Sequence, residues 1–293
     1  DYIKDLNPDI IHIHGLWRKP TRIIKELSKI SQNIIVSPHG MLNKELFNQS
    51  KFKKQISMFL FEKRNLKNIK FFHSLNEYES KCIKYFFPFK PSEIISTGIR
   101  MPEKYEYENS LKTELKSILN KKKIILYLGR LVSRKGIKEL IEAWLNLNKE
   151  ACNNDWILVF AGFGPLSKLL KKLNQDKNKR ILFIGEVYGE KKDFLLSSST
   201  AFILPSNGEG TPISALEALS YKTVCLLSDK CNLENLSNKN ISYRIEKNSK
   251  SIEDNLKLLF KLNEKEINHK KEMGIKYIEK EHNWELTTQK MIN

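Results

Sequence analysis

The sequence contains no long hydrophobic run. No stretch of about 18 apolar residues occurs, and the chain does not open with the charged, apolar and small-residue pattern of a secretory leader. These two absences argue against a transmembrane helix and against secretion. We therefore expect a cytoplasmic protein.

Cysteine is also scarce. Cys82, Cys152, Cys225 and Cys231 show no C-x-x-C spacing and no nearby histidine that would complete a zinc site. Cys225 lies inside an apolar strand pattern. We expect all four cysteines to be reduced and structural.

Basic residues are in large excess. Lysine and arginine outnumber aspartate and glutamate by 51 to 34, which gives a formal net charge of +17. This charge suits a nucleic acid, an anionic membrane surface or a phosphorylated substrate. We find no helix-turn-helix, zinc-finger or RNP-like aromatic pattern, so no nucleic-acid partner is expected. The length of 293 residues and the hydrophobic share of 40% suffice for about two domains with cores of their own.

Apolar runs alternate with helical stretches from residue 124 onward, which is the βαβ pattern of a doubly wound parallel sheet. The expected strands cover 124–128, 156–160, 180–184, 201–204 and 223–227. Earlier strands are expected at 10–13, 33–36, 70–73 and 93–96, too few for a whole nucleotide-binding fold. The polar stretch 102–109 separates the two groups as a linker, and 264–292 has a helical pattern.

Basic and acidic residues follow two of the expected strands. Gly129-Arg130 and Ser133-Arg-Lys-Gly136 place cations and a glycine turn at the carboxyl end of a strand, where open α/β sheets bind ligands. A diphosphate fits there, and the alternative is a solvated basic loop. Glu209 and Glu217 flank the start of a helix, where free N–H groups attract anions and carboxylates accept hydrogen bonds from hydroxyls. The alternative is a capped amphipathic helix.

These segments resemble the E-x7-E element and the diphosphate-binding loop of GT4 (group 1) retaining glycosyltransferases with the GT-B fold. Ser37-Pro-His-Gly-Met-Leu42 resembles the members of that family that build surface polysaccharides such as capsule and lipopolysaccharide. The resemblance implies two Rossmann-like domains: a partial acceptor-side domain over 1–103 and a donor-binding domain over 104–275. It also implies a C-terminal helix over 276–293 that returns toward the first domain.

The resemblance implies a role for each matching position. Gly129, Arg130 and Lys135 contact the donor diphosphate, and Val187 and Tyr188, after the third strand, contact the base unless they form an ordinary turn. Glu209 faces the transferred sugar, and Glu217 binds the ribose hydroxyls. Backbone groups of Gly210 and Thr211, next to the helix-starting Pro212, hold anions or sugar oxygens. Gly162 lies in a glycine turn that permits close approach, although the third glycine of a dinucleotide fingerprint is missing.

Histidines mark the expected acceptor side. His39, followed by Gly40, corresponds to the position that faces the donor sugar, where a neutral imidazole could bind a hydroxyl or the leaving phosphate. His12 and His14 alternate on the first strand, and we expect their side chains to point apart, with His14 the better candidate for lining a cleft. The alternative for His14 and His39 is a buried strand-end histidine bonded to the backbone.

The sequence departs from the family pattern at two places. Thr97-Gly-Ile-Arg100 stands where the family has Asn-Gly-Val-Asp, and the glycine-rich first loop of the N-terminal domain has no counterpart. We therefore expect further residues before Asp1. The resemblance does not decide whether the chain is active without them.

A basic segment, Lys51–Lys67, carries Phe52, Ile56, Phe59 and Leu60 at helical spacing. We favour a helix that packs these residues into the core. The alternative is an amphipathic helix lying on an anionic membrane, which a lipid-linked acceptor would make useful.

Taken together, the sequence predicts a retaining hexosyltransferase-like enzyme that takes a UDP- or GDP-sugar. Its partners are the nucleotide sugar and a glycan or polyprenyl-linked acceptor, with contact to the inner face of the membrane as a further possibility. We expect no cofactor and no metal, since the sequence has no Asp-x-Asp pair. A catalytically inactive sugar-nucleotide-binding or partner protein of the same fold is the alternative.

Overall fold

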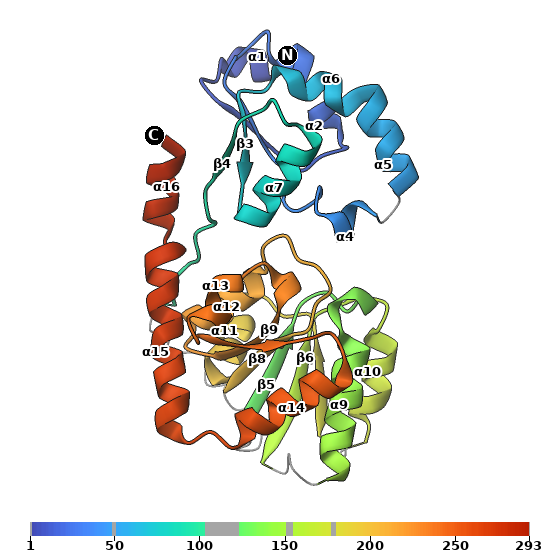
Figure 1. Ribbon diagram of the computed structural model, residues 1–293, viewed down its shortest axis with the longest axis vertical. Helices are drawn as coiled ribbons and strands as arrows, with labels where there is room; N and C mark the ends of the chain where they lie inside the picture. The colour runs from blue at the N-terminus through green and yellow to red at the C-terminus, as the bar shows by residue number, and fades with distance from the viewer. Residues whose placement is uncertain (1, 49–50, 103–122, 151–154, 177–179, 293) are drawn as a thin grey trace. The chain divides into compact units, whose positions relative to one another are not determined.

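The computed structural model describes residues 2–48, 51–102, 123–150, 155–176 and 180–292 (Figure 1). The chain forms two compact units. Unit 1 comprises residues 1–97, 209–211 and 285–293, and unit 2 comprises 98–208 and 212–284. Most of the expected linker 102–109 and Cys152 lie outside the described residues.

Unit 1 contains a parallel sheet of four described strands in sequence order. They are β1 (Ile11–His14), β2 (Ile34–Ser37), β3 (Phe71–Ser74) and β4 (Ser92–Ile94). Each lies within one or two residues of its predicted range. β2 is buried throughout because it has a strand on either side and a core on both faces, which is why its sequence is a continuous apolar run.

Short helices surround this sheet. They are α1 (Tyr2–Leu6), α2 (Lys19–Arg22), α3 (Ile24–Leu27), α4 (Lys44–Phe47), α5 (Lys51–Ser57), α6 (Lys63–Asn65), α7 (Glu77–Phe86) and most of α16 (Trp284–Ile292). A π-helical turn, η1 (Met58–Glu62), and a 3₁₀ turn, η2 (Leu66–Asn68), flank α6. Ile24, Ile34, Leu66, Phe72 and Ile83 lie at the centre of the core.

The apolar face predicted for Lys51–Lys67 does not pack into the core. Phe52 and Phe59 are 75% and 82% exposed, and Ile56 and Leu60 are also exposed. Met58, Glu62 and Leu66 are buried instead. The π-helical turn inserts one extra residue into the helix and rotates the buried face away from the predicted one. The prediction of a core-packing face was therefore wrong.

Unit 2 is a doubly wound parallel sheet. Its strands are β5 (Lys123–Leu128), β6 (Trp156–Ala161), β7 (Ile181–Gly185), β8 (Ala201–Leu204), β9 (Val224–Ser228) and β10 (Ser242–Ile245), in the order β10-β9-β8-β5-β6-β7. The five predicted strands are present, and β10 is additional. β10 escaped prediction because it is a four-residue edge strand whose middle residues are Tyr243 and Arg244.

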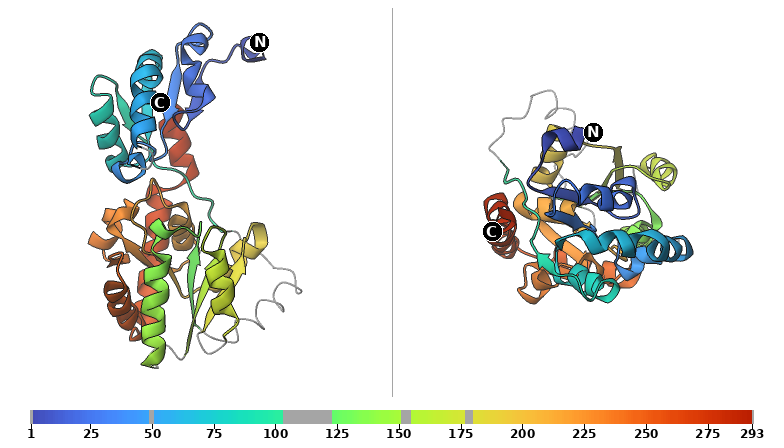
Figure 2. Two further views of the ribbon diagram at one scale, coloured as in Figure 1. Left: turned by 90° about the vertical axis from the view of Figure 1, so that its right-hand side faces the viewer. Right: turned by 90° about the horizontal axis from the view of Figure 1, so that it is seen from above.

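Helices cover both faces of this sheet, as Figures 1 and 2 show. They are α9 (Ile137–Lys149), α10 (Ser167–Asn174), α11 (Gly189–Ser198), α12 (Ile213–Ser220), α13 (Glu234–Asn238), α14 (Ser249–Phe260) and α15 (Glu264–Glu281), with 3₁₀ turns η3 (Ser133–Lys135) and η5 (Asp229–Cys231). α9 packs on α14, and α12 packs on α15. The fully buried Trp144, Tyr127, Phe160 and Phe202 belong to the core between these layers.

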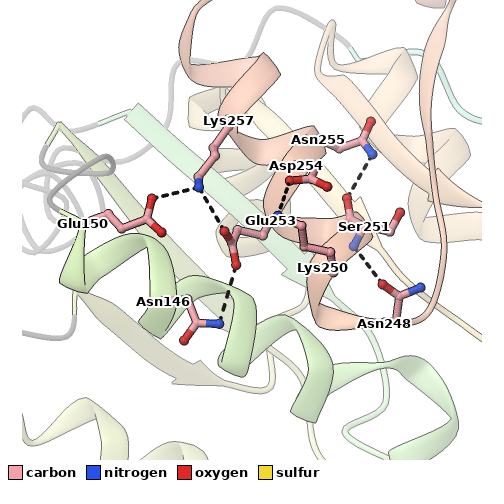
Figure 3. Close-up of polar contacts among 9 residues, drawn as sticks. All are labelled: Asn146, Glu150, Asn248, Lys250, Ser251, Glu253, Asp254, Asn255 and Lys257. Atoms are coloured by element: carbon pink, nitrogen blue, oxygen red, sulfur yellow. Dashed lines mark hydrogen bonds and ion pairs between the residues drawn. The ribbon is translucent and has the colours of Figure 1, made fainter.

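Polar contacts join α9 to α14 at the surface (Figure 3). Lys257 Nζ lies 2.8 Å from Glu150 Oε2 and 2.9 Å from Glu253 Oε1. These two carboxylates raise the pKa of Lys257. Because the ammonium group is in solvent, we expect the apolar helix contacts rather than this network to hold α14 in place.

The start of α14 depends on a side-chain cap. Asn248 Oδ1 accepts a hydrogen bond from the Ser251 amide at 2.8 Å (Figure 3). We expect Asn248→Ala to lower the free energy of unfolding by about 1 kcal/mol, because an amide at the helix start loses its acceptor. Denaturant titration would measure the loss. Asn248→Ser, which keeps a capping oxygen, is the matched control, and an equal loss in both variants would contradict the capping role.

The C-terminal helical stretch is interrupted. The sequence pattern indicated one helix over 264–292, whereas α15 ends at Glu281 and α16 begins at Trp284. The carbonyl oxygen of His282 accepts a hydrogen bond from the Ile99 amide at 2.7 Å. This carbonyl therefore bonds outside the helix, at the point where α15 ends. Such a contact, 183 residues away in sequence, left no local signal.

The structure gives two further facts about the described residues. Cys82, Cys225 and Cys231 are not in disulfides, and burial raises the pKa of Cys225. Within the described ranges, no helix has the length and apolar character needed to cross a bilayer.

Candidate functional site

The topology of unit 2 places a ligand-binding position between β5 and β8. From β5 the chain proceeds through β6 and β7 on one side, and then crosses to β8, β9 and β10 on the other. Neighbouring strands whose connections run in opposite directions leave a crevice at their carboxyl ends, where doubly wound sheets bind ligands. The predicted loop Gly129–Gly136 follows β5, and Pro205–Gly208 follows β8.

These two loops are held together mainly through their backbones. The Asn207 amide donates to the Arg134 carbonyl oxygen at 2.8 Å, and Arg134 Nη1 donates to the Gly208 carbonyl oxygen at 2.6 Å. Gly136 has φ +72°, and a Cβ there would lie 2.2 Å from the Pro205 oxygen, so only glycine fits. Arg134, which the motif comparison did not single out, is therefore a structural clamp of the loop.

The predicted diphosphate-binding cations lie on this clamped loop. Arg130 is exposed at the start of the loop, and Lys135 is half-buried at its end, in the 3₁₀ turn η3. The Tyr127 hydroxyl donates to the Arg130 carbonyl oxygen at 2.8 Å, which ties the loop to β5. Two cations on a rigid loop at a strand end are suited to an anionic ligand.

The glycine turn after β6 supports the same loop. Gly162 has φ +136°, and a Cβ on it would lie 2.0 Å from the Gly129 oxygen. The Gly129 amide donates to the Ala161 carbonyl oxygen at 3.0 Å, and the Leu131 amide donates to the Phe163 carbonyl oxygen at 2.9 Å. The close approach predicted at Gly162 is thus made by the backbone of the β5 loop.

The end of β7 exposes one aromatic ring. Val187 is buried, so its side chain packs in the core, whereas Tyr188 is 74% exposed. The Tyr188 hydroxyl donates to Glu186 Oε2 at 3.2 Å, and the Glu186 carboxylate raises the pKa of Tyr188. An exposed ring at a strand end is available for stacking on a planar group.

Glu217 has a partner that the sequence did not reveal. It lies on α12, and its Oε1 is 2.8 Å from Lys192 Nζ on α11. Both side chains are about one quarter exposed, at 24% and 29%. Because the two residues belong to different helices 25 positions apart, no local spacing could have indicated the pair.

Unit 1 contains a cluster of four histidines at the ends of its strands. His12 Nε2 lies 2.6 Å from Ser37 Oγ, which lies 2.8 Å from His73 Nδ1. His73 Nε2 lies 2.8 Å from the Ile95 carbonyl oxygen. His14 Nδ1 lies 2.7 Å from His39 Nε2, with the two rings stacked. The structure thus brings together the predicted His14 and His39, and adds His12 and His73.

The expectation that His12 and His14 point apart was wrong. Their ring centroids are 4.3 Å apart. Residues two positions apart on a strand share one face, because successive side chains alternate. The sequence His-Ile-His on a strand was therefore a signal for a histidine pair.

Three histidines of the cluster, His12, His39 and His73, have lowered pKa values. Burial, followed by the nearby His14 and His73, lowers the pKa of His12 from 6.5 to about 4. Burial is also the main cause that lowers the pKa values of His39 and His73. The imidazoles of His12, His39 and His73 are therefore neutral at neutral pH, and each offers one donor and one acceptor nitrogen.

This cluster predicts a pH dependence of stability. The unfolded chain takes up a proton on His12 near pH 6.5, whereas the folded chain does so only near pH 4. Acidification through this window therefore favours unfolding. We expect the free energy of unfolding to fall less in His12→Asn than in the unsubstituted protein, as measured by urea titration on both sides of the window. The exposed His269→Asn is the control, and equal slopes in all three proteins would contradict the assignment.

The segment Glu209–Thr211 belongs to unit 1 and lies against its strand-end loops. Asn43 Nδ2 donates to the Glu209 carbonyl oxygen at 3.0 Å, and Asn76 Nδ2 donates to the Gly210 carbonyl oxygen at 2.9 Å. A Cβ on Gly40 would lie 2.6 Å from the Gly210 Cα. Glu209 is thereby held near the turn that carries His39, and its side chain is 7% exposed.

A buried carboxylate shapes that turn. Glu79 Oε1 accepts from the Gly40 amide, and Oε2 accepts from the Leu75 amide at 2.8 Å. His39 and Gly40 both have positive φ angles, +52° and +74°. Burial raises the pKa of Glu79, although the two amides act in the opposite direction. Sequence reasoning missed Glu79 because its partners lie up to 39 positions away.

The predicted residues thus fall into two groups. Gly129, Arg130, Lys135, Gly162, Val187, Tyr188, Pro212 and Glu217 lie in unit 2, and His14, His39, Gly40, Glu209, Gly210 and Thr211 lie in unit 1. Among the residues that the structure describes, no group of three or more His, Cys, Asp or Glu side chains could hold a metal ion.

The fold and the clamped cationic loop are typical of proteins that bind an anionic ligand at the switch point of a Rossmann-like unit. Comparison with known families makes this specific. Residues 112–277 match the family described as glycosyl transferases group 1, and the chain belongs to that family. Its architecture of two parallel-sheet Rossmann-like domains is the GT-B fold.

Individual relatives agree with this family. TuaC of Bacillus subtilis (strain 168), a glycosyltransferase assigned to teichuronic acid biosynthesis, is 29% identical over 57% of this chain and 39% of its own length. The Escherichia coli UDP-Gal:alpha-D-GlcNAc-diphosphoundecaprenol alpha-1,3-galactosyltransferase is 29% identical over 53% of this chain and 41% of its own length. The chain thus spans about two fifths of the curated relatives it matches.

A solved structure shows the same fold over nearly the whole chain. WaaG, a glycosyltransferase involved in lipopolysaccharide biosynthesis, superposes with a TM-score of 0.71 at 15% identity. The match covers 98% of this chain and 78% of WaaG.

Proposed function

We propose that the protein is a retaining glycosyltransferase that moves a sugar from a nucleoside diphosphate sugar to an acceptor in cell-surface polysaccharide synthesis. The observation that carries this proposal is the clamped loop with Arg130 and Lys135 at the switch point of the unit 2 sheet, in a chain of the group 1 family. Retention of configuration follows from the family resemblance alone.

The proposed mechanism is electrostatic. When the sugar leaves, negative charge develops on the departing diphosphate, and preorganised cations stabilise that charge. Arg130, Lys135 and the amino end of α12 supply positive potential without reorganising, so no metal is required. Tyr188 contributes a stacking surface for the base, and Glu217 accepts hydrogen bonds from the ribose once Lys192 releases part of its carboxylate.

Residues of unit 1 act on the sugar in this proposal. Glu209 positions the transferred sugar. His39, kept neutral by its surroundings, donates a hydrogen bond to a sugar hydroxyl or to the leaving phosphate, and His14 orients it through their contact of 2.7 Å. His14, His39 and Gly40 also belong to the part of the site that binds the acceptor in this proposal.

The acceptor class is a glycan or a polyprenyl-linked glycan. The E. coli relative acts, by its name, on a diphosphoundecaprenol-linked sugar with UDP-Gal as donor, and TuaC is assigned to a cell-wall polymer. We place the protein in the cytoplasm, with peripheral contact to the anionic inner face of the membrane. The excess of 51 basic over 34 acidic residues supports such contact.

The second candidate is a catalytically inactive protein that binds sugar nucleotides. Thr97-Gly-Ile-Arg100, which lacks the family's Asn and Asp side chains, favours it. The two candidates share donor binding and differ in sugar transfer. Measuring donor binding and sugar transfer on the same full-length protein therefore separates them.

Donor binding is tested by thermal stabilisation. A nucleotide sugar that binds only the folded protein stabilises it by about 2.7 kcal/mol at 100 times its Kd. We expect a UDP- or GDP-sugar to raise the Tm, and Lys135→Gln to remove most of that increase. Lys138→Gln, on the exposed surface of α9, is the matched control. If no nucleotide sugar raised the Tm, or if both variants behaved alike, the donor site would be elsewhere or absent.

A further inference from the structure

A hollow in unit 1 plays no part in the donor site. It has a volume of about 740 Å³ and lies between α4, α5 and the π-helical turn on one side and α7 on the other. This volume is in the range of small-molecule sites, which hold about 300–1,000 Å³. Residues of α5 and α7, whose positions in unit 1 can be followed in Figure 1, are among those that line it.

The floor of the hollow is apolar. Leu42, Phe47 and Met58 line it and are almost fully buried, and the Phe86 ring lies with its centroid 4.7 Å from that of Phe47. An apolar floor of aromatic and thioether side chains accepts a flexible hydrocarbon chain because such side chains adapt to its shape. The floor alone would suit any apolar group.

The rim of the hollow carries charge of one sign. Lys44, Lys51, Lys63 and Lys81 line it and are exposed, and none of the fourteen described residues that line it is acidic. Lys81 Nζ lies 4.0 Å from Glu77 Oε2, but both side chains are about four fifths exposed, so the pair is weak. Lysines clustered around an apolar hollow, with only this weak carboxylate contact among the described residues, are suited to binding phosphate groups.

Two exposed rings extend the floor toward solvent. Phe59 and Tyr85 line the hollow and are each 82% exposed. Exposing two large rings costs free energy in water unless a ligand covers them. An amphiphile with a phosphate end and a hydrocarbon chain would satisfy the rim, the floor and these two rings together.

We propose that this hollow binds the lipid end of a polyprenyl diphosphate-linked acceptor, with the diphosphate at the lysine rim and the first isoprene units on the aromatic floor. The inference rests on the proposed transfer to a lipid-linked acceptor and names the site that holds the lipid. The rim and floor thereby select acceptors that carry a charged head and an apolar tail at once.

Farnesyl diphosphate, a soluble short analogue of the lipid end, provides the test. By isothermal titration calorimetry on the full-length protein, we expect one farnesyl diphosphate to bind, at least about tenfold more tightly than inorganic diphosphate or farnesol. Lys51→Gln/Lys63→Gln is expected to weaken binding by about tenfold or more. Phe59→Ser is expected to weaken the binding of farnesyl diphosphate without affecting the binding of inorganic diphosphate.

Matched variants lie on the same segment outside the hollow. Lys53→Gln/Lys67→Gln removes two exposed lysines that do not line it, and Phe52→Ser removes an exposed ring that does not line it. We expect less than about a twofold change in either variant. Equal weakening by both lysine pairs, or an absence of farnesyl diphosphate binding, would overturn the proposal.

Two further arms separate this inference from its alternatives. Vesicles containing phosphatidylglycerol test a bilayer surface as the partner, since general attraction to a bilayer would fall equally with both lysine pairs. UDP-sugar binding, measured in parallel, tests the donor site. If farnesyl diphosphate binds with the expected lysine dependence while no nucleotide sugar binds, the lipid site is supported and the glycosyltransferase proposal fails. If a nucleotide sugar binds and farnesyl diphosphate does not, only the lipid-site proposal fails.

Discussion

Glu209→Gln is expected to lower sugar transfer by about 100-fold or more, because removing one group that is preorganised for the transition state typically costs two to three orders of magnitude. Donor affinity should change by less than about threefold, since an interaction made mainly in the transition state lowers kcat rather than binding. Glutamine has nearly the same shape, and the contact between Asn43 and the Glu209 carbonyl oxygen does not involve the side chain. The loop should therefore stay in place.

The measurement is initial rates of transfer, with donor affinity from thermal stabilisation, on the full-length protein. Glu190→Gln, an exposed carboxylate in the first turn of α11, is the control. Unchanged transfer in Glu209→Gln would remove Glu209 from the mechanism. Donor binding without transfer in the unsubstituted protein would favour the inactive candidate instead.

Gly162→Ala is expected to lower the free energy of unfolding by about 4 kcal/mol or more, among the largest effects of a single substitution. Two causes combine. The residue has φ +136°, which L side chains rarely adopt, and its Cβ would lie 2.0 Å from the Gly129 oxygen. Neither can be relieved without moving the loop that carries Arg130, so donor binding should be lost as well.

Gly189→Ala is the matched control for this prediction. Gly189 also has a positive φ, +51°, but no atom of the described residues beyond its own helix backbone and chain neighbours lies within 4 Å of the position of a Cβ there. We expect a cost of about 1–2 kcal/mol for the left-handed backbone alone. Denaturant titration measures both variants. Similar losses in the two would show that the contact with Gly129 contributes nothing.

The buried parallel strands were predictable because burial on both faces requires nearly continuous apolar runs. Ile34–Val36 and Ala201–Leu204 are such runs. The edge strand β10 was missed because its central residues, Tyr243 and Arg244, face partly toward solvent and carry no such pattern. The π-helical turn at Met58–Glu62 was also unpredictable, since a helical spacing assumes a constant number of residues per turn.

The candidate site was predictable only where its residues follow strands. Arg130 and Lys135 stand at a strand end in the sequence and in the structure. His73, Glu79 and Lys192 were missed because each has a partner 22 to 39 positions away that comes near it only through the fold. Sequence periodicity reports local geometry, and such long-range pairs lie beyond it.

The interlocked turns after β5, β6 and β8 have a consequence for changing donor preference. The turn after β8 occupies the space that a side chain at Gly136 would need, and the turn after β5 occupies the space that a side chain at Gly162 would need. A change in one of the three turns therefore requires a matching change in its neighbour. Variation that reshapes the choice of base or sugar must therefore enter elsewhere, at exposed positions such as Tyr188. A combinatorial library aimed at new donors would keep the turns constant and randomise the end of β7.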